Sequence, residues 1–179
     1  MQRLVRRALS SASSSTTSPL LYCVRTHTWL QQRSSPRLAR IGLTDRALDD
    51  IGEVEAVQNL VSMGESVDIN AEMLKIDWEA MSISDGDELY HTRWANITGS
   101  HFLKAPVAGE IVAVNDAALR VGKYGGVIDA DAWLVELSLE NGADLSHLCN
   151  ADEYEEKARE SGGGAFGASD DTLTYSSYG

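Results

Sequence analysis

The sequence predicts a mainly β domain, a small sandwich or flattened barrel with two helices at its margins. Short runs of β-branched and aromatic residues follow one another through the middle of the chain, separated by turn residues. Some of these runs alternate between apolar and polar residues, which is typical of half-buried strands. Only two segments carry the capping residues and spacing of a helix. Short strands with few helices favour a sandwich or barrel architecture.

The expected strands are closely spaced. They lie around Leu30 and at residues 39–43, 54–60, 73–78, 89–94, 102–105, 110–114 and 133–139. The run at 110–114 is among the clearest, because Pro106 and Gly109 supply turn chemistry directly before it. In the run at 133–139, alternate positions face opposite sides of a sheet, which predicts one buried face.

Two helices are expected at the margins of the strands. At 44–52, Thr44 can cap the N-terminus and Gly52 can terminate the helix. At 150–159, Asn150 is the expected N-cap, acidic residues come first and basic residues come last. That order of charges suits the helix dipole.

The 179 residues carry a formal net charge of −12, and this length suits one domain. A strongly acidic surface repels phosphate backbones, so nucleic-acid binding is disfavoured. No apolar run approaches the ~20 residues that cross a bilayer, so no membrane span is expected. Cys23 and Cys149 form no CxxC pattern and indicate incidental thiols in a reducing compartment.

The two ends of the chain differ in composition from the middle. The first acidic residue is Asp45, and residues 1–20 contain three arginines, many serines and no acid. This composition is typical of an organellar import peptide, so we expect a mitochondrial (matrix) protein first and a chloroplast protein second. Residues 160–179 are rich in glycine and serine and are expected to be disordered. The ordered domain is therefore expected at 21–159.

Six short motifs occur in an order that resembles one known family. They are Tyr22 with His27-Thr-Trp29-Leu30, and the segments 42–53, 61–67, 106–115, 132–139 and 144–155. Together they resemble the glycine cleavage system H protein family. The resemblance implies a lipoyl-domain-like fold of two small sheets, with a hairpin that presents one lysine amide-linked to lipoate. It also implies a carrier-like protein that is not an enzyme and whose partners are glycine decarboxylase, aminomethyltransferase and dihydrolipoyl dehydrogenase.

The sequence departs from this family at the lipoyl position. The family's lysine lies eight residues before the proline of a P-V-x-G motif, and counting back from Pro106 reaches Thr98. Residues Asn96 to Gly99 have good turn chemistry, so we expect the tip of the hairpin there, without its lysine. A threonine hydroxyl cannot form the lipoamide. We therefore expect no cofactor, and lipoate only if another lysine serves.

Other positions near the motif are weaker candidates. Lys104, two residues before Pro106, is expected on the return strand at the base of the hairpin. Lys75 is a poorer candidate still. In Glu79-Ala-Met-Ser82, which resembles the E-A-M-K of biotin carriers, Ser82 again replaces the lysine.

An insertion at about 68–86 also separates this chain from the family, and its alternating apolar residues predict an added edge strand or a thicker sheet beside the hairpin. His91 and His101 flank Asn96 almost evenly and predict a polar cross-strand pair. Two histidines without a nearby cysteine or acid cluster make a poor zinc site, so no metal is expected. No nucleophile with a partnering base stands out, so no catalytic residues are expected.

Two functions are compatible with these observations. The first is an H-type module without a lipoyl site, which acts as a binding, scaffold or accessory subunit in a glycine cleavage assembly or a larger mitochondrial complex. The alternative is a functional carrier, lipoylated at Lys104 or elsewhere, that shuttles the aminomethyl group during glycine decarboxylation.

Overall fold

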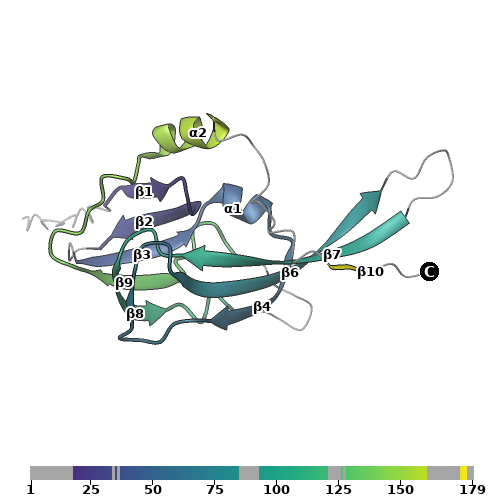
Figure 1. The fold of residues 1–179 in the computed structure, drawn as a ribbon, viewed down its shortest axis with the longest axis horizontal. Coiled ribbons are helices and arrows are strands. Elements are labelled where there is room, and N and C mark those ends of the chain that lie inside the picture. The colour runs from purple at the N-terminus through teal and green to yellow at the C-terminus, as the bar shows by residue number, and fades with distance from the viewer. Residues whose placement is uncertain are drawn as a thin grey trace, which may run out of the picture.

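Two antiparallel sheets form the fold (Figure 1). The computed structural model describes residues 18–33, 35, 37–84, 93–120, 126, 128–160 and 174–176. The first sheet has the order β1-β2-β3-β9-β8-β5, with β1 (Leu20–Cys23), β2 (Thr28–Gln32), β3 (Leu38–Leu43), β5 (Ser66–Val67), β8 (Gly109–Val114) and β9 (Val135–Leu139). The second has the order β10-β7-β6-β4, with β4 (Glu53–Asn59), β6 (Glu72–Ser84), β7 (Arg93–Lys104) and β10 (Thr174–Ser176). The predicted mainly β fold of the flattened sandwich type is confirmed.

One apolar core joins the two sheets. Ile41, Ile111 and Leu137 from the first sheet belong to the same buried cluster as Ile76 and Leu103 from the second. Each of these side chains is at most 1% exposed. The cluster forms because alternate residues of each strand point to the same face of a sheet.

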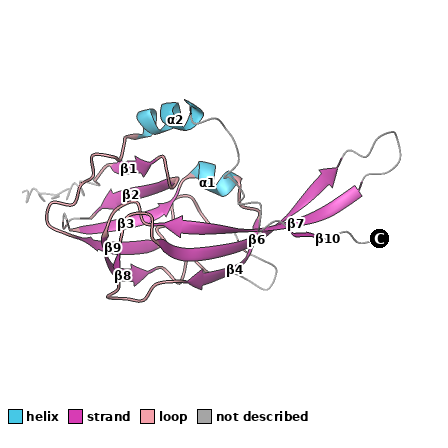
Figure 2. Cartoon of the chain, in the orientation of Figure 1, coloured by secondary structure: helices cyan, strands magenta, loops and turns pink. Residues whose placement is uncertain are grey.

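Two short helices lie at the margins, as expected: α1 (Asp45–Asp49) and α2 (Ala151–Glu160) (Figure 2). The backbone N–H of Ala47 donates to Thr44 Oγ1 at 3.3 Å, and that of Glu153 donates to Asn150 Oδ1 at 3.0 Å, so both predicted N-caps are confirmed. Among the described residues, no helix has the length and apolar content to span a membrane.

Several elements differ from the sequence-based expectation. β1 and β5 were not expected, and β10 lies within the segment predicted to be a disordered tail. β1 forms because it pairs with β2, with Tyr22 opposite Trp29, and bridges to Cys149. A four-residue strand carries little sequence signal of its own, and its bridge to Cys149 depends on a residue far away in the chain. The predicted import peptide, apart from residues 18–20, lies outside the described residues.

Candidate functional site

The long β6–β7 hairpin is the part of the structure that corresponds to the predicted lipoyl hairpin. Its strands pair from Glu72 opposite Lys104 to Ser84 opposite Arg93. β4 pairs with β6 only as far as Glu79, and the far part of the hairpin extends away from both sheets (Figure 1). Residues 85–92, between the two strands, lie outside the described residues.

The segment predicted as an insertion, at 68–86, forms the first strand of the hairpin. We expected an added edge strand or a thicker sheet, but most of this segment is β6, which pairs with β4 on one side and β7 on the other. Met73, Leu74 and Ile76 of this strand are fully buried. The pairing on both sides, and not burial, places β6 inside the sheet instead of at its edge.

Thr98 lies within a strand, so the prediction of a turn at Asn96–Gly99 was wrong. Thr98 pairs with Glu79, and Asn96 pairs with Met81. Gly99 serves packing here: a Cβ added to it would lie 2.5 Å from Cζ2 of Trp78, its cross-strand neighbour. The glycine that suggested a turn instead admits an indole ring. Thr98, the position reached by counting back eight residues from Pro106, therefore lies in the middle of the β6–β7 ladder.

The two lysines of the hairpin lie near its base. Lys104 is the last residue of β7, as predicted, and its Nζ is 3.5 Å from Oε1 of its cross-strand partner Glu72. Lys75 Nζ is 2.9 Å from Asp77 Oδ1, which also accepts a hydrogen bond from Ser100 Oγ. Burial raises the pKa of Asp77, but the hydrogen bonds from Ser100 and Lys75 outweigh it and leave that pKa below its ordinary value.

The predicted pair of histidines does not form across the ladder. His101 is opposite Ile76, and His91 lies outside the described residues. The error follows from the misplaced turn, because moving the tip of a hairpin changes every cross-strand partner. His101 is buried, at 7% exposure. No group of three or more potential metal-ligating side chains occurs within the described part of the chain.

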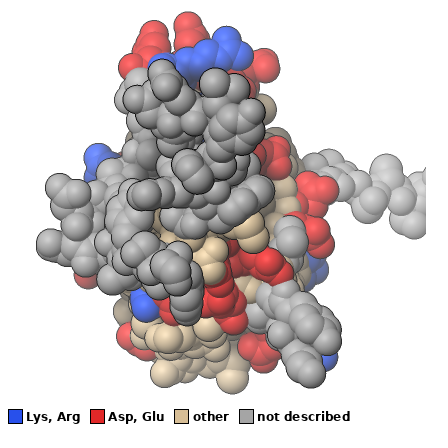
Figure 3. All heavy atoms as spheres, turned by 90° about the vertical axis from the view of Figure 1, so that its right-hand side faces the viewer, with Lys and Arg blue, Asp and Glu red and all other residues tan. Residues whose placement is uncertain are grey.

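Ser82 is on β6, where its register partner is Ala95. Towards the base of the same sheet, acidic residues gather: Glu53 is opposite Glu79. A hydrogen bond with Glu79 raises the pKa of Glu55, with smaller contributions from burial and from neighbouring acids. On the face shown in Figure 3, acidic side chains are more prominent than basic ones among the described residues.

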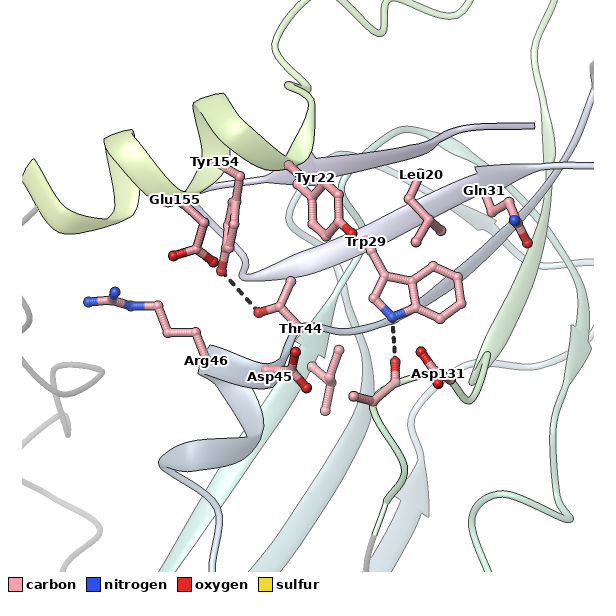
Figure 4. A pocket seen from close by; sticks show the side chains of 13 residues that line it. Leu20, Tyr22, Trp29, Gln31, Thr44, Asp45, Arg46, Asp131, Tyr154 and Glu155 are labelled. Atoms are coloured by element: carbon pink, nitrogen blue, oxygen red, sulfur yellow. Dashed lines mark hydrogen bonds between the residues drawn. The ribbon is translucent and has the colours of Figure 1, made fainter. Parts of the chain in front are cut away.

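A polar network connects α2 to the start of α1 and to the β1–β2 turn. The Tyr154 hydroxyl is 2.7 Å from His27 Nδ1 and 3.0 Å from Thr44 Oγ1 (Figure 4). Thr44 Oγ1 donates to the His27 carbonyl at 3.0 Å, so its only proton is used there. Tyr154 must then donate to Thr44 and accept from His27 Nδ1–H. One proton arrangement therefore satisfies all three side chains.

Replacing Tyr154 by phenylalanine is expected to lower the free energy of unfolding by about 1–2 kcal/mol, because the buried partners lose their hydrogen bonds. Tyr154 is 3% exposed. Tyr22→Phe is the matched control, since the Tyr22 ring stacks on Tyr154 at 5.3 Å but its hydroxyl makes no hydrogen bond with the described residues. Urea denaturation of both variants measures the difference. Equal losses would contradict a stabilising role of the Tyr154 hydroxyl.

A cavity of about 290 Å³ lies beside this network, between β1, β2, the start of α1 and α2 (Figure 4). The sequence did not predict it. Its walls come from residues as far apart as Leu20 and Glu155, and no local motif joins them. Strand pairing within the first sheet and the packing of α2 against β1 bring these residues together.

The fold and the hairpin define a class of protein: a two-sheet β domain of the lipoyl-domain-like type. Comparison with known proteins gives the particular family. The protein named "Probable glycine cleavage system H protein" from Natronomonas pharaonis is 32% identical over 138 residues, which cover 74% of this chain and 88% of that protein. The "Glycine cleavage system H protein, mitochondrial" from Flaveria trinervia is 29% identical over 173 residues, 88% of this chain and 90% of that protein. The chain belongs to the glycine cleavage system H protein family. No family model matches it.

Proposed function

We propose that this chain is a mitochondrial H-type protein without a lipoyl arm, acting as a binding, scaffold or accessory subunit. One observation carries the proposal: the sequence contains no lysine between Ile76 and Leu103. That interval includes the far part of both hairpin strands and the whole connection between them. A lipoyl amide requires a primary amine, and a swinging arm requires that amine on an exposed tip. Residues 85–92, which connect the two strands in the sequence, contain no lysine.

The β6–β7 hairpin is long. Glu79 and Thr98 are opposite each other in its ladder, and 18 residues lie between them in the sequence (98 − 79 − 1). An extended two-stranded arm is suited to contact with another protein. Glycine decarboxylase, aminomethyltransferase, dihydrolipoyl dehydrogenase or a larger mitochondrial complex are the partners that we propose, because the relatives are named for the glycine cleavage system. We assign no catalytic step to the chain itself.

The alternative function is that of a lipoylated carrier. Lys104 favours it in one respect, because its side chain is 43% exposed. Its position at the hairpin base and its ion pair with Glu72 disfavour it. A modified Lys104 would hold the dithiolane beside the body of the domain, which gives a swinging arm less reach than a tip would.

Intact-mass spectrometry of the protein purified from mitochondria distinguishes the two functions. We expect an unmodified mass for the wild type, for Lys104→Arg and for Thr98→Lys. The last variant restores a lysine at the counted position, but its amine would lie within a ladder opposite Glu79. An adduct of about 188 Da on the wild type, the mass expected for a lipoyl group, would overturn the proposal. Loss of that adduct in Lys104→Arg would establish the alternative.

The mitochondrial location is proposed from the first 20 residues and from the named location of the Flaveria relatives. Changing Arg3, Arg6 and Arg7 together to glutamine is expected to abolish import, because import receptors and the membrane potential select positive amphipathic segments. Fluorescence microscopy of the full chain fused at its C-terminus measures the location. The matched control replaces Arg33 and Arg37 by glutamine, outside that segment. Chloroplast signal in the wild type would favour the second location.

A further inference from the structure

We propose that the cavity beside α2 is a binding site for a small organic cation, an alkylammonium or guanidinium group with a short apolar stem. The proposal goes beyond the proposed function and does not depend on it. The volume of about 290 Å³ is close to the lower end of the range for small-molecule sites. It therefore suits a molecule of side-chain size.

The walls of the cavity are aromatic. Tyr22, Trp29 and Tyr154 all line it (Figure 4). Two of the three have occupied polar atoms: Trp29 Nε1 donates to the Ala130 carbonyl at 2.8 Å, and the Tyr154 hydroxyl is bonded to His27 and Thr44. The Tyr22 hydroxyl makes no hydrogen bond with the described residues. Tyr22 is half-buried, whereas Trp29 and Tyr154 are only 6% and 3% exposed, so the Tyr22 ring is the one most open to a ligand. Aromatic surfaces attract organic cations through their ring quadrupoles.

The charge at the cavity is mainly negative. Asp45, Asp131 and Glu155 line it, against the single cation Arg46. None of the four forms an ion pair within the described part of the chain. Burial is the largest cause of the raised pKa of Tyr22, and the negative charges of these three carboxylates are the next largest. All three therefore act on the same side chain of the cavity wall. The three carboxylates would repel an anion.

An inorganic cation is a poorer fit than an organic one. The carboxylates are exposed and lie at the rim, and no three of the described potential ligands group closely enough to hold a metal ion. A ligand must instead extend from the rim carboxylates to the aromatic wall. A guanidinium or ammonium group on an apolar stem has that shape.

The cation could be a free molecule or a basic side chain of this chain. Arg3, Arg6 and Arg7 precede Leu20, which lines the cavity, and Gln31 Nε2 donates to the Ser18 carbonyl at 3.3 Å. The chemistry is the same in both cases. A tethered arginine would act at a high effective concentration and would compete with an added ligand.

The test is a titration of the full chain by two-dimensional NMR with n-butylguanidinium, read at the indole N–H of Trp29, which is assigned with Trp29→Phe. We expect saturable shifts with n-butylguanidinium and none with n-butylurea, which has nearly the same shape but no charge. Asp131→Asn and Glu155→Gln should each weaken binding about two- to fivefold, the range for exposed charge pairs. Arg46→Gln should strengthen it, because it removes the competing cation.

Glu156→Gln is the matched control, because it removes the same charge from the next residue of α2, which does not line this cavity. Its affinity should equal that of the wild type. Equal shifts with n-butylurea, equal weakening in Glu156→Gln, or weaker binding in Arg46→Gln would each overturn the proposal. The triple change of Arg3, Arg6 and Arg7 to glutamine identifies the source: tighter probe binding indicates the chain's own arginines, and unchanged binding indicates a free cation.

Discussion

Gly42→Ala is expected to lower the free energy of unfolding by about 3 kcal/mol, the upper end for overpacking a well-packed site. Gly42 pairs with Trp29 across β2 and β3. A Cβ at this position would overlap the six-membered ring of Trp29 and lie 2.6 Å from the Ala132 carbonyl oxygen. The indole cannot move away freely, because it is 6% exposed and bonded to Ala130. Urea denaturation followed by circular dichroism measures the change.

Gly142→Ala is the matched control for this steric effect. Gly142 has a φ of +78°, and a Cβ there meets nothing within 4 Å. Its replacement should cost about 1 kcal/mol through backbone strain alone. Trp29→Phe should reduce the penalty of Gly42→Ala, because the smaller ring vacates part of the space. Equal losses for the two glycines, or no coupling between Gly42 and Trp29, would contradict the packing described here.

Acidification from pH 6.5 to pH 4 is expected to remove roughly 3 kcal/mol of stability through His101 alone. Burial lowers the pKa of this imidazole from 6.5 to about 4, with Asp50 opposing the shift and His27 and Lys104 adding to it. Between these two pH values the unfolded chain binds a proton that the folded chain does not. The free energy of unfolding therefore falls as the pH falls through this window.

His101→Gln should flatten this part of the stability profile, because glutamine does not titrate. His27 contributes in the same direction, since burial also lowers its pKa, so the comparison is best made in a His27→Gln background. The lowered pKa of Asp77 affects stability mainly below its ordinary value of 3.8. An unchanged slope between pH 6.5 and 4 in His101→Gln would show that His101 is not buried in the neutral form.

The hairpin shows which features of the fold can be predicted from local sequence patterns and which cannot. The alternation at 110–114 and 133–139 located most of β8 and all of β9, because a strand's inward face depends on its own residues. Asn96 and Gly99 suggested a turn by the same kind of local reasoning, and there it failed. Gly99 is a packing partner of Trp78, a residue of the opposite strand 21 positions earlier (99 − 78). A glycine in the sequence does not show whether it forms a turn or makes room for a neighbouring side chain.

The order of the family motifs, the two helix caps and the absence of lysine from 77–102 were all determined by the sequence itself. The motif order and the missing lysine are read directly from residue types. The helix caps depend on residues within a few positions, and such local preferences are expressed wherever the segment folds. The register of the β6–β7 ladder, the burial of His101 and the aromatic cavity beside α2 were decided only by the tertiary structure. These features depend on which distant strands and helices pack together, and pairing and packing energies between remote segments leave no local signature in the chain.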